Sequence, residues 1–156
     1  MKNKLRLYID TCVFGGYFDK EFSADSIRFI HDLHTGKAIV LMGESLIEEV
    51  NRARKEIRDL VDGLPTDKTQ YLPIDDEVKA LRDEYIKQNV VTKKSINDAT
   101  HVALATIHRA DAIVSWNFKH IVRLSKIKGF NRVNLENGYR EIVIVTPKEV
   151  VFDEED

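Results

Sequence analysis

Four polar side chains occupy positions where an alternating strand and helix fold would place a catalytic site. Asp10 and Asn117 each follow a strand-like segment, whereas Glu49 and Asp98 lie near the starts of two helix-like segments. Carboxylates offer only oxygen ligands, which suit Mg²⁺ or Mn²⁺ rather than zinc. A divalent ion held there could activate water and stabilise charge on a phosphodiester. The residue types therefore predict metal-assisted hydrolysis, with Asp10, Glu49 and Asp98 as candidate metal ligands.

Two of these residues also allow a simpler role. Asp10 or Thr11 could cap the turn after the first strand, and position alone does not separate that role from metal binding. Thr11 could equally supply a hydroxyl group to the same site. Asn117 could cap the next helix, or its side-chain carbonyl could orient a water molecule or act as a weak ligand.

Helix geometry separates Glu49 from its neighbour Glu48. At about 100° per residue, Glu48 points away from the apolar stripe that includes Leu46 and towards solvent. Glu49 lies beside that stripe and can face the edge of the sheet. A role in stabilising the start of the helix, with an ion pair to Arg52, is also open to Glu49.

Asp98 occupies the third position of a segment, Ser95 to Asp98, that resembles a capping box. The helix that follows is apolar or small around most of its circumference, which indicates burial on several sides. A carboxylate at the entrance of a buried helix favours a chemical role, and capping does not exclude metal binding. The five histidines lack zinc-ligand spacing, and we expect His101 and His108 to be structural or surface residues.

Strands and helices are expected to alternate along the chain. Apolar runs predict strands, and three-and-four spacing of apolar residues predicts helices. The strands are expected at 5–9, 38–42, 112–115 and 142–145, and the helices at 23–34 with Ser23 as N-cap, 44–61, from 73–75 onward, and 95–109. This order predicts a three-layer α/β/α fold with a central, mainly parallel sheet of four to five strands. Ligands of such sheets bind outside the carboxyl ends of the strands.

The 156-residue length fits a single domain over 1–150, followed by an acidic tail at 151–156. The single cysteine, Cys12, excludes an internal disulfide and a Cys-rich zinc site. Together with the absence of a long apolar run or a signal-peptide pattern, this predicts a cytoplasmic protein without a membrane association.

The distribution of charge favours an anionic partner more than the total charge does. The formal net charge is −2. However, the segment 117–140 carries six basic residues and one acidic residue. Within it, Lys119, Arg123 and Lys126 are candidate phosphate contacts, although each could equally be a solvated helix residue.

Several motifs occur in a fixed order along most of the chain, from a strand ending in Asp10 to a strand followed by Asn117. They are Tyr8-Ile9-Asp10-Thr11, Glu48-Glu49-Val50, Asn97-Asp98-Ala99-Thr100-His101-Val102-Ala103-Leu104-Ala105 and Asp111-Ala112-Ile113-Val114-Ser115-Trp116-Asn117. In this combination the sequence resembles the PIN-domain nucleases, the family that includes the VapC-type toxins.

The resemblance implies a parallel sheet with a central first strand and a Mg²⁺- or Mn²⁺-dependent endonuclease that cleaves RNA. It also implies a cognate antitoxin and a homodimer. By the same resemblance Asp10, Glu49 and Asp98 are metal ligands, and a one-residue shift would instead use Glu48. Asn117 stands where family members often have a fourth acid. This exchange removes one negative charge, which weakens the expectation of a tightly held second metal.

Two other functions were compatible with parts of the pattern. A non-catalytic nucleic-acid-binding or scaffold domain would keep the fold with weakened metal binding, and Asn117 favours it. A phosphoacceptor signalling domain also places acids at strand ends. However, the chain lacks both the acidic pair before Asp10 and the lysine after a late strand that this class requires.

Overall fold

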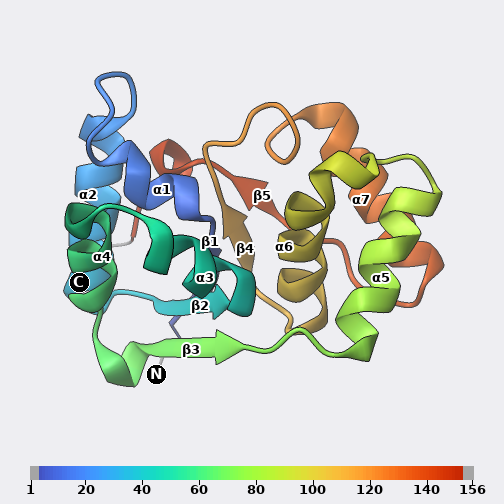
Figure 1. Cartoon of the computed structure of the whole chain (residues 1–156), viewed down its shortest axis with the longest axis horizontal. Helices are drawn as coiled ribbons and strands as arrows, with labels where there is room; N and C mark the ends of the chain where they lie inside the picture. The colour runs from blue at the N-terminus through green and yellow to red at the C-terminus, as the bar shows by residue number, and fades with distance from the viewer. Residues whose placement is uncertain (1–3, 153–156) are drawn as a thin grey trace.

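Short apolar segments form the strands of one sheet in the computed structural model, which describes residues 4–152 (Figure 1). The strands are β1 (Arg6–Ile9), β2 (Ile39–Gly43), β3 (Thr69–Leu72), β4 (Ala112–Val114) and β5 (Ile144–Val145). Their order is β3-β2-β1-β4-β5, and each neighbouring pair is parallel. The predicted parallel sheet with a central first strand is confirmed.

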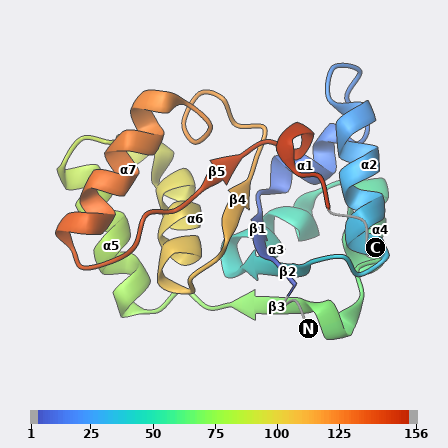
Figure 2. The same ribbon diagram turned by 180° about the vertical axis from the view of Figure 1, so that it is seen from behind.

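Helices cover both faces of this sheet (Figures 1 and 2). They are α1 (Thr11–Gly16), α2 (Ser23–His34), α3 (Glu44–Arg52), α4 (Lys55–Asp62), α5 (Asp76–Lys87), α6 (Ile96–Ile107) and α7 (Leu124–Glu136), with 3₁₀ turns at Thr66–Lys68, Lys93–Ser95 and Pro147–Glu149. No helix within residues 4–152 combines the length and hydrophobicity needed to cross a membrane.

Alternating side chains of β1 divide the interior into two hydrophobic cores. Leu7 and Ile9 pack in the core that α1, α2, α3 and α4 share with the sheet. Tyr8 points to the other face and packs in the core formed with α5, α6 and α7. Because successive residues of a strand face opposite ways, one four-residue strand supports both layers.

The prediction of a single helix over 44–61 is wrong, because the segment forms two helices, α3 and α4. Ala53 and Arg54 have extended backbone between α3 and α4, with ψ of 165° and 158°. The Arg54 guanidinium lies 4.6 Å from the ring centroid of Phe18, and apolar residues of α4 pack on the same core as α3. Neither proline nor glycine marks this break, so tertiary packing overrides the helix propensity of the segment.

Other boundaries also differ from the predictions. Strand β3 and helices α1 and α7 were not predicted. Ser23 is the first residue of α2 rather than its N-cap, and the Ser95 side chain makes no capping hydrogen bond to α6. The predicted capping box is therefore wrong, which frees Asp98 for other contacts. Of the predicted acidic tail, residues 153–156 lie outside the described part of the chain.

A buried polar network joins the helices of one layer. Tyr85 on α5 donates a hydrogen bond to Oδ1 of Asn134 on α7, and Asn134 Nδ2 donates to Oγ1 of Thr106 on α6 over 3.1 Å. Burial raises the pKa of Tyr85, so its hydroxyl remains a donor. The network ties down α6, the helix that carries Asp98 and His101.

Replacing Tyr85 by phenylalanine tests the contribution of this network. Tyr85→Phe should lower the free energy of unfolding by about 1–3 kcal/mol, because the buried Asn134 oxygen loses its donor. Urea unfolding measures the change. Tyr71→Phe is the matched control, since Tyr71 is 61% exposed on β3. Equal stabilities for Tyr85→Phe and the parent protein would contradict the prediction.

Candidate active site

The carboxyl ends of β1 and β4 place Asp10 in a buried polar environment. The Asp10 N–H donates to the carbonyl of Val114 over 3.0 Å, and its side chain is satisfied by Ser115, whose Oγ donates to Oδ2 over 2.8 Å. Asp10 is 6% exposed. The Cys12 thiol lies 3.4 Å from the same oxygen, and burial together with the charge of Asp10 raises the pKa of Cys12 to about 12. Cys12 is therefore a neutral neighbour of the carboxylate.

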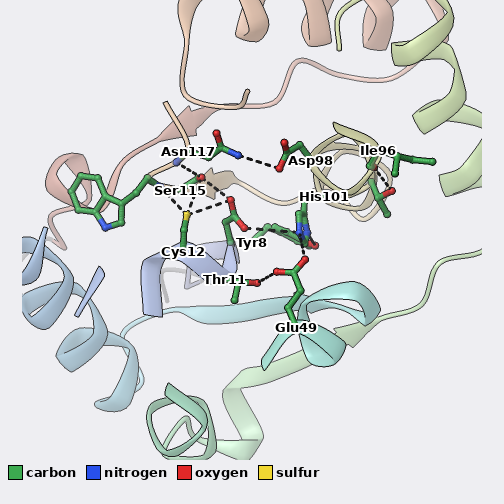
Figure 3. Close-up of polar contacts among 12 residues, drawn as sticks. Tyr8, Thr11, Cys12, Glu49, Ile96, Asp98, His101, Ser115 and Asn117 are labelled. Carbon is green, nitrogen blue, oxygen red and sulfur yellow. Dashed lines mark hydrogen bonds and ion pairs between the residues drawn. The ribbon is translucent and has the colours of Figure 1, made fainter. Parts of the chain in front are cut away.

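Glu49 faces the same edge of the sheet from helix α3, which starts directly after β2. Its Oε2 accepts a hydrogen bond of 2.5 Å from Oγ1 of Thr11 (Figure 3). Glu48 is exposed, whereas Glu49 is partly buried. The structure therefore brings Glu49 and Thr11 to the site and leaves Glu48 in solvent.

Asp98 and Asn117 meet across the site. Asn117 Nδ2 donates to Oδ1 of Asp98 over 3.1 Å (Figure 3). At the same time Asn117 Oδ1 accepts from the backbone N–H of His120 over 3.0 Å. Asn117 thus caps the turn that follows it and also orients the carboxylate of Asp98. Burial, followed by the negative charge of Asp10, raises the pKa of Asp98.

His101 is a site residue that the sequence analysis missed. It is 2% exposed, and its Nε2 lies 3.6 Å from Oε1 of Glu49 and 3.9 Å from Oδ1 of Asp10. The hydroxyl of Tyr8 and Nδ1 of His101 share a 2.6 Å hydrogen bond. The sequence analysis expected a structural or surface residue at this position and did not assign His101 to the candidate active site. Its spacing of three residues after Asp98 puts both on one helix face and could have indicated the site.

The electrostatics of the site favour positive charge between its carboxylates. Contact with His101 lowers the pKa of Glu49, burial opposes this shift, and the Thr11 hydroxyl adds to it. For His101, burial disfavours the charged form, but contact with Glu49 and the charges of Asp10, Glu49 and Asp98 raise the pKa overall. His101 therefore lies against Glu49 and close to Asp10 in this structure.

The carboxylates share one neighbourhood, but they do not form a ready-made metal cage. Within residues 4–152, no three His, Cys, Asp or Glu side chains are grouped closely enough to hold a metal ion as they stand. Instead, each carboxylate contacts a donor: Ser115 for Asp10, Thr11 for Glu49 and Asn117 for Asp98.

The three candidate phosphate contacts have different surroundings. Lys119 and Arg123 are exposed in the segment between β4 and α7. Lys126 is partly buried, and its Nζ donates to the carbonyl of Val90 over 2.7 Å. Only Lys119 and Arg123 are thus exposed to an anionic ligand.

Comparison with known families decides how this arrangement is classified. The profile of the PIN-domain family matches residues 7–122, a span that includes Asp10, Glu49, Asp98 and Asn117. The chain belongs to the PIN-domain family. A search of curated proteins found no match.

Solved structures share the fold of this PIN domain at low sequence identity. VapBC2 from Rickettsia felis, bound to a DNA fragment from their promoter, aligns with TM-score 0.58 and 11% identity over 91% of this chain and 98% of that chain. FitAcB from Neisseria gonorrhoeae aligns with TM-score 0.59 and 12% identity, over 92% and 99%. Tyrosyl-tRNA synthetase from Aeropyrum pernix aligns with TM-score 0.50 and 11% identity over 92% of this chain, but over only 53% of that chain.

The close approach of Gly43 to Tyr8 gives a test of how the site is held. A Cβ on Gly43 would overlap the Tyr8 hydroxyl and lie 2.6 Å from Cδ1 of Leu104. Gly43→Ala should therefore cost about 1–3 kcal/mol of stability, as overpacking of a core does. It should also displace Tyr8 from His101, which NMR of the histidine ring would detect.

Gly15 is the matched control for this substitution. A Cβ there meets nothing within 4 Å, and the residue lies inside helix α1. Gly15→Ala should leave stability unchanged or raise it by up to about 1 kcal/mol, since alanine is the better helix former. Equal unfolding midpoints for the Gly43 and Gly15 variants would show that the contact with Tyr8 is not tight.

Proposed function

We propose that this PIN domain is a cytoplasmic, metal-dependent endoribonuclease that hydrolyses RNA phosphodiester bonds. One observation carries the proposal. Asp10 after β1 and Glu49 on α3 both lie within 4 Å of the buried His101 at the carboxyl edge of the sheet, and Asp98 lies on the same helix as His101, one turn before it. The carboxylates are satisfied by neutral hydroxyl and amide donors and by His101, rather than by arginine or lysine.

The donor set fits Mg²⁺ or Mn²⁺ in its chemistry. Asp10, Glu49 and Asp98 supply hard oxygen ligands, and the effect of Asp10 on the Asp98 pKa reflects a concentration of negative charge that a cation would relieve. When bound, such an ion activates water and stabilises charge that develops on phosphate. His101 contacts two of the three carboxylates, so it shares these oxygens with any ion.

The remaining polar groups have positioning roles in this proposal. Thr11 and Ser115 fix the carboxylates of Glu49 and Asp10 through hydroxyl donors, and Asn117 fixes Asp98. Neutral donors hold a carboxylate without cancelling its charge, which leaves that charge available to a cation. Lys119 and Arg123 are exposed beyond β4, where they could contact phosphates of a bound strand.

An RNA cleavage assay with conservative variants tests the nuclease assignment. Asp10→Asn, Glu49→Gln and Asp98→Asn should each lower the Mn²⁺-dependent cleavage rate on the order of 100-fold or more, because each loses a ligand charge. Glu48→Gln is the matched control, since Glu48 neighbours Glu49 in sequence but is exposed. Circular dichroism confirms folding of each variant. Equal rates in all of these proteins would defeat the nuclease assignment.

Metal binding can be measured without activity. Mn²⁺ at about 100 times its dissociation constant should stabilise the folded protein by about 2.7 kcal/mol, since a ligand that binds only the native state shifts unfolding by mass action. Thermal unfolding with and without Mn²⁺ measures this. Asp98→Asn should abolish the increase, whereas Glu48→Gln should retain it. An increase that persists in Asp98→Asn would place the ion elsewhere.

A non-catalytic nucleic-acid-binding or scaffold domain is the second candidate function. It is favoured by Asn117, which contributes an amide where a fourth acid often stands, and by the absence of a preformed three-ligand group within residues 4–152. This function predicts RNA binding without cleavage and no effect of Asp10→Asn. The cleavage assay therefore separates the two functions.

The toxin role is part of the same proposal. The resemblance to VapC-type toxins and the shared fold with chains of VapBC2 and FitAcB support a cognate antitoxin partner. Expression of the protein alone should then arrest growth, and co-expression of the product of a small adjacent gene should restore it. A homodimer is expected from the same resemblance, and light scattering of the purified protein measures it.

A further inference from the structure

An aromatic cluster, Phe22, Trp116 and Phe118, lies directly beside the candidate active site. The Phe22 and Trp116 rings are stacked, with centroids 4.5 Å apart and planes at 25°. The Phe118 centroid is 6.1 Å from that of Phe22 and 6.2 Å from that of Trp116. Phe118 is 49% exposed, so the cluster presents a ring to solvent.

One short segment carries both this cluster and part of the candidate active site. In Ser115-Trp116-Asn117-Phe118, Ser115 and Asn117 contact Asp10 and Asp98. The two aromatic residues of the segment, Trp116 and Phe118, pack near Phe22 instead. The polar and aromatic side chains of this segment therefore have different partners. Asn117, which contacts Asp98, stands directly between Trp116 and Phe118 in the chain.

Contacts with helices α1 and α2 hold Trp116, the inner member of the cluster. Trp116 Nε1 donates to Oγ of Ser26 over 2.9 Å, and the Trp116 N–H donates to the Cys12 sulfur over 3.2 Å. A Cβ at Gly16 would lie 2.8 Å from Trp116 Nε1, so the indole packs closely on α1. Trp116 thus serves as a fixed support, whereas Phe118 is the exposed member.

Two exposed basic residues follow Phe118 in the chain. Lys119 follows Phe118 directly, and Arg123 is exposed four residues later. An exposed aromatic ring with exposed cations in the same segment fits an unpaired nucleobase with its phosphates, since bases stack on aromatic rings while basic residues hold the backbone. A base within a duplex does not offer its face for such stacking.

We propose that Phe22, Trp116 and Phe118 form a stacking subsite for an unpaired nucleobase of an RNA strand bound at the candidate active site. The subsite selects single-stranded RNA or loops over duplex, with Phe118 as the ring that contacts the base. The inference rests on the proposed ribonuclease function for its substrate, but its test measures binding separately from cleavage.

Trp116 is the only tryptophan of the chain, so its fluorescence reports directly on the cluster. The full-length protein is titrated in EDTA, which prevents metal-dependent cleavage, with a single-stranded oligouridine on the order of ten nucleotides long. The same length of RNA duplex and an oligomer with abasic sites serve as comparison ligands. Single-stranded RNA should change the emission, and duplex and abasic RNA should not.

Three variants identify the contact. Phe118→Ala should weaken binding of the single strand by about 5- to 100-fold, the usual loss when one stacking aromatic is removed. Phe118→Tyr should retain the affinity, because the ring remains. Tyr71→Ala removes an aromatic side chain that is 61% exposed on β3, away from the site, and should have no effect.

The outcomes separate this proposal from the nuclease assignment. If the parent protein cleaves RNA but Phe118→Ala binds the single strand as well as the parent does, the subsite is overturned and the nuclease stands. If no protein cleaves but the binding pattern holds, the nuclease fails and the subsite stands. Equal binding of duplex and single strand also overturns the subsite. It is likewise overturned if Phe118→Ala weakens association with a partner protein but leaves RNA binding unchanged.

Discussion

β1 lies between β2 and β4, and this position fixes what can meet at the carboxyl edge of the sheet. Its last residue is followed at once by Asp10, while the ends of β2 and β4 lead to Glu49 and to Asn117. A parallel sheet brings all strand ends to one edge, so residues about 40 and 100 positions apart become neighbours without any local sequence relation. The alternation of Leu7, Tyr8 and Ile9 across β1 then anchors both helical layers against the same strand.

The need to compensate buried negative charge shapes the rest of the site. A desolvated carboxylate costs several kcal/mol unless hydrogen bonds or a cation offset it. Here the hydroxyl and amide donors supply hydrogen bonds, and His101, held by Tyr8, places its Nε2 3.6 Å from Glu49 and 3.9 Å from Asp10. Tyr8 in turn requires Gly43, because a larger residue would occupy the space of its hydroxyl. The first strand therefore leads directly into Asp10 and, through Tyr8 on its opposite face, holds the histidine that lies beside that carboxylate.

The sequence was sufficient for strands β1, β2, β4 and β5 of the described sheet, and for placing the carboxylates near the ends of strands and the starts of helices. Apolar runs indicate buried strands whatever the tertiary contacts, and helix periodicity distinguishes Glu49 from Glu48 by face. The break at Ala53 and the edge strand β3 could not be predicted, because packing against other segments determines both. His101 was missed for a related reason: histidine was considered as a zinc ligand by spacing, whereas its role here depends on Tyr8 and Glu49, which only the fold brings near.

The segment after β4 shows how a single chain geometry can serve two purposes. Its polar residues contact the carboxylates and its aromatic residues pack against α1 and α2, so the rings are covalently linked to the donors that hold Asp10 and Asp98. Trp116 is held by Cys12 and Gly16 on α1 and by Ser26 on α2, and it cannot move without disturbing Asn117, its neighbour in sequence. Phe118 packs its ring near the other two but is half exposed, so it is the part of the cluster that a ligand can reach while Ser115 and Asn117 hold the carboxylates.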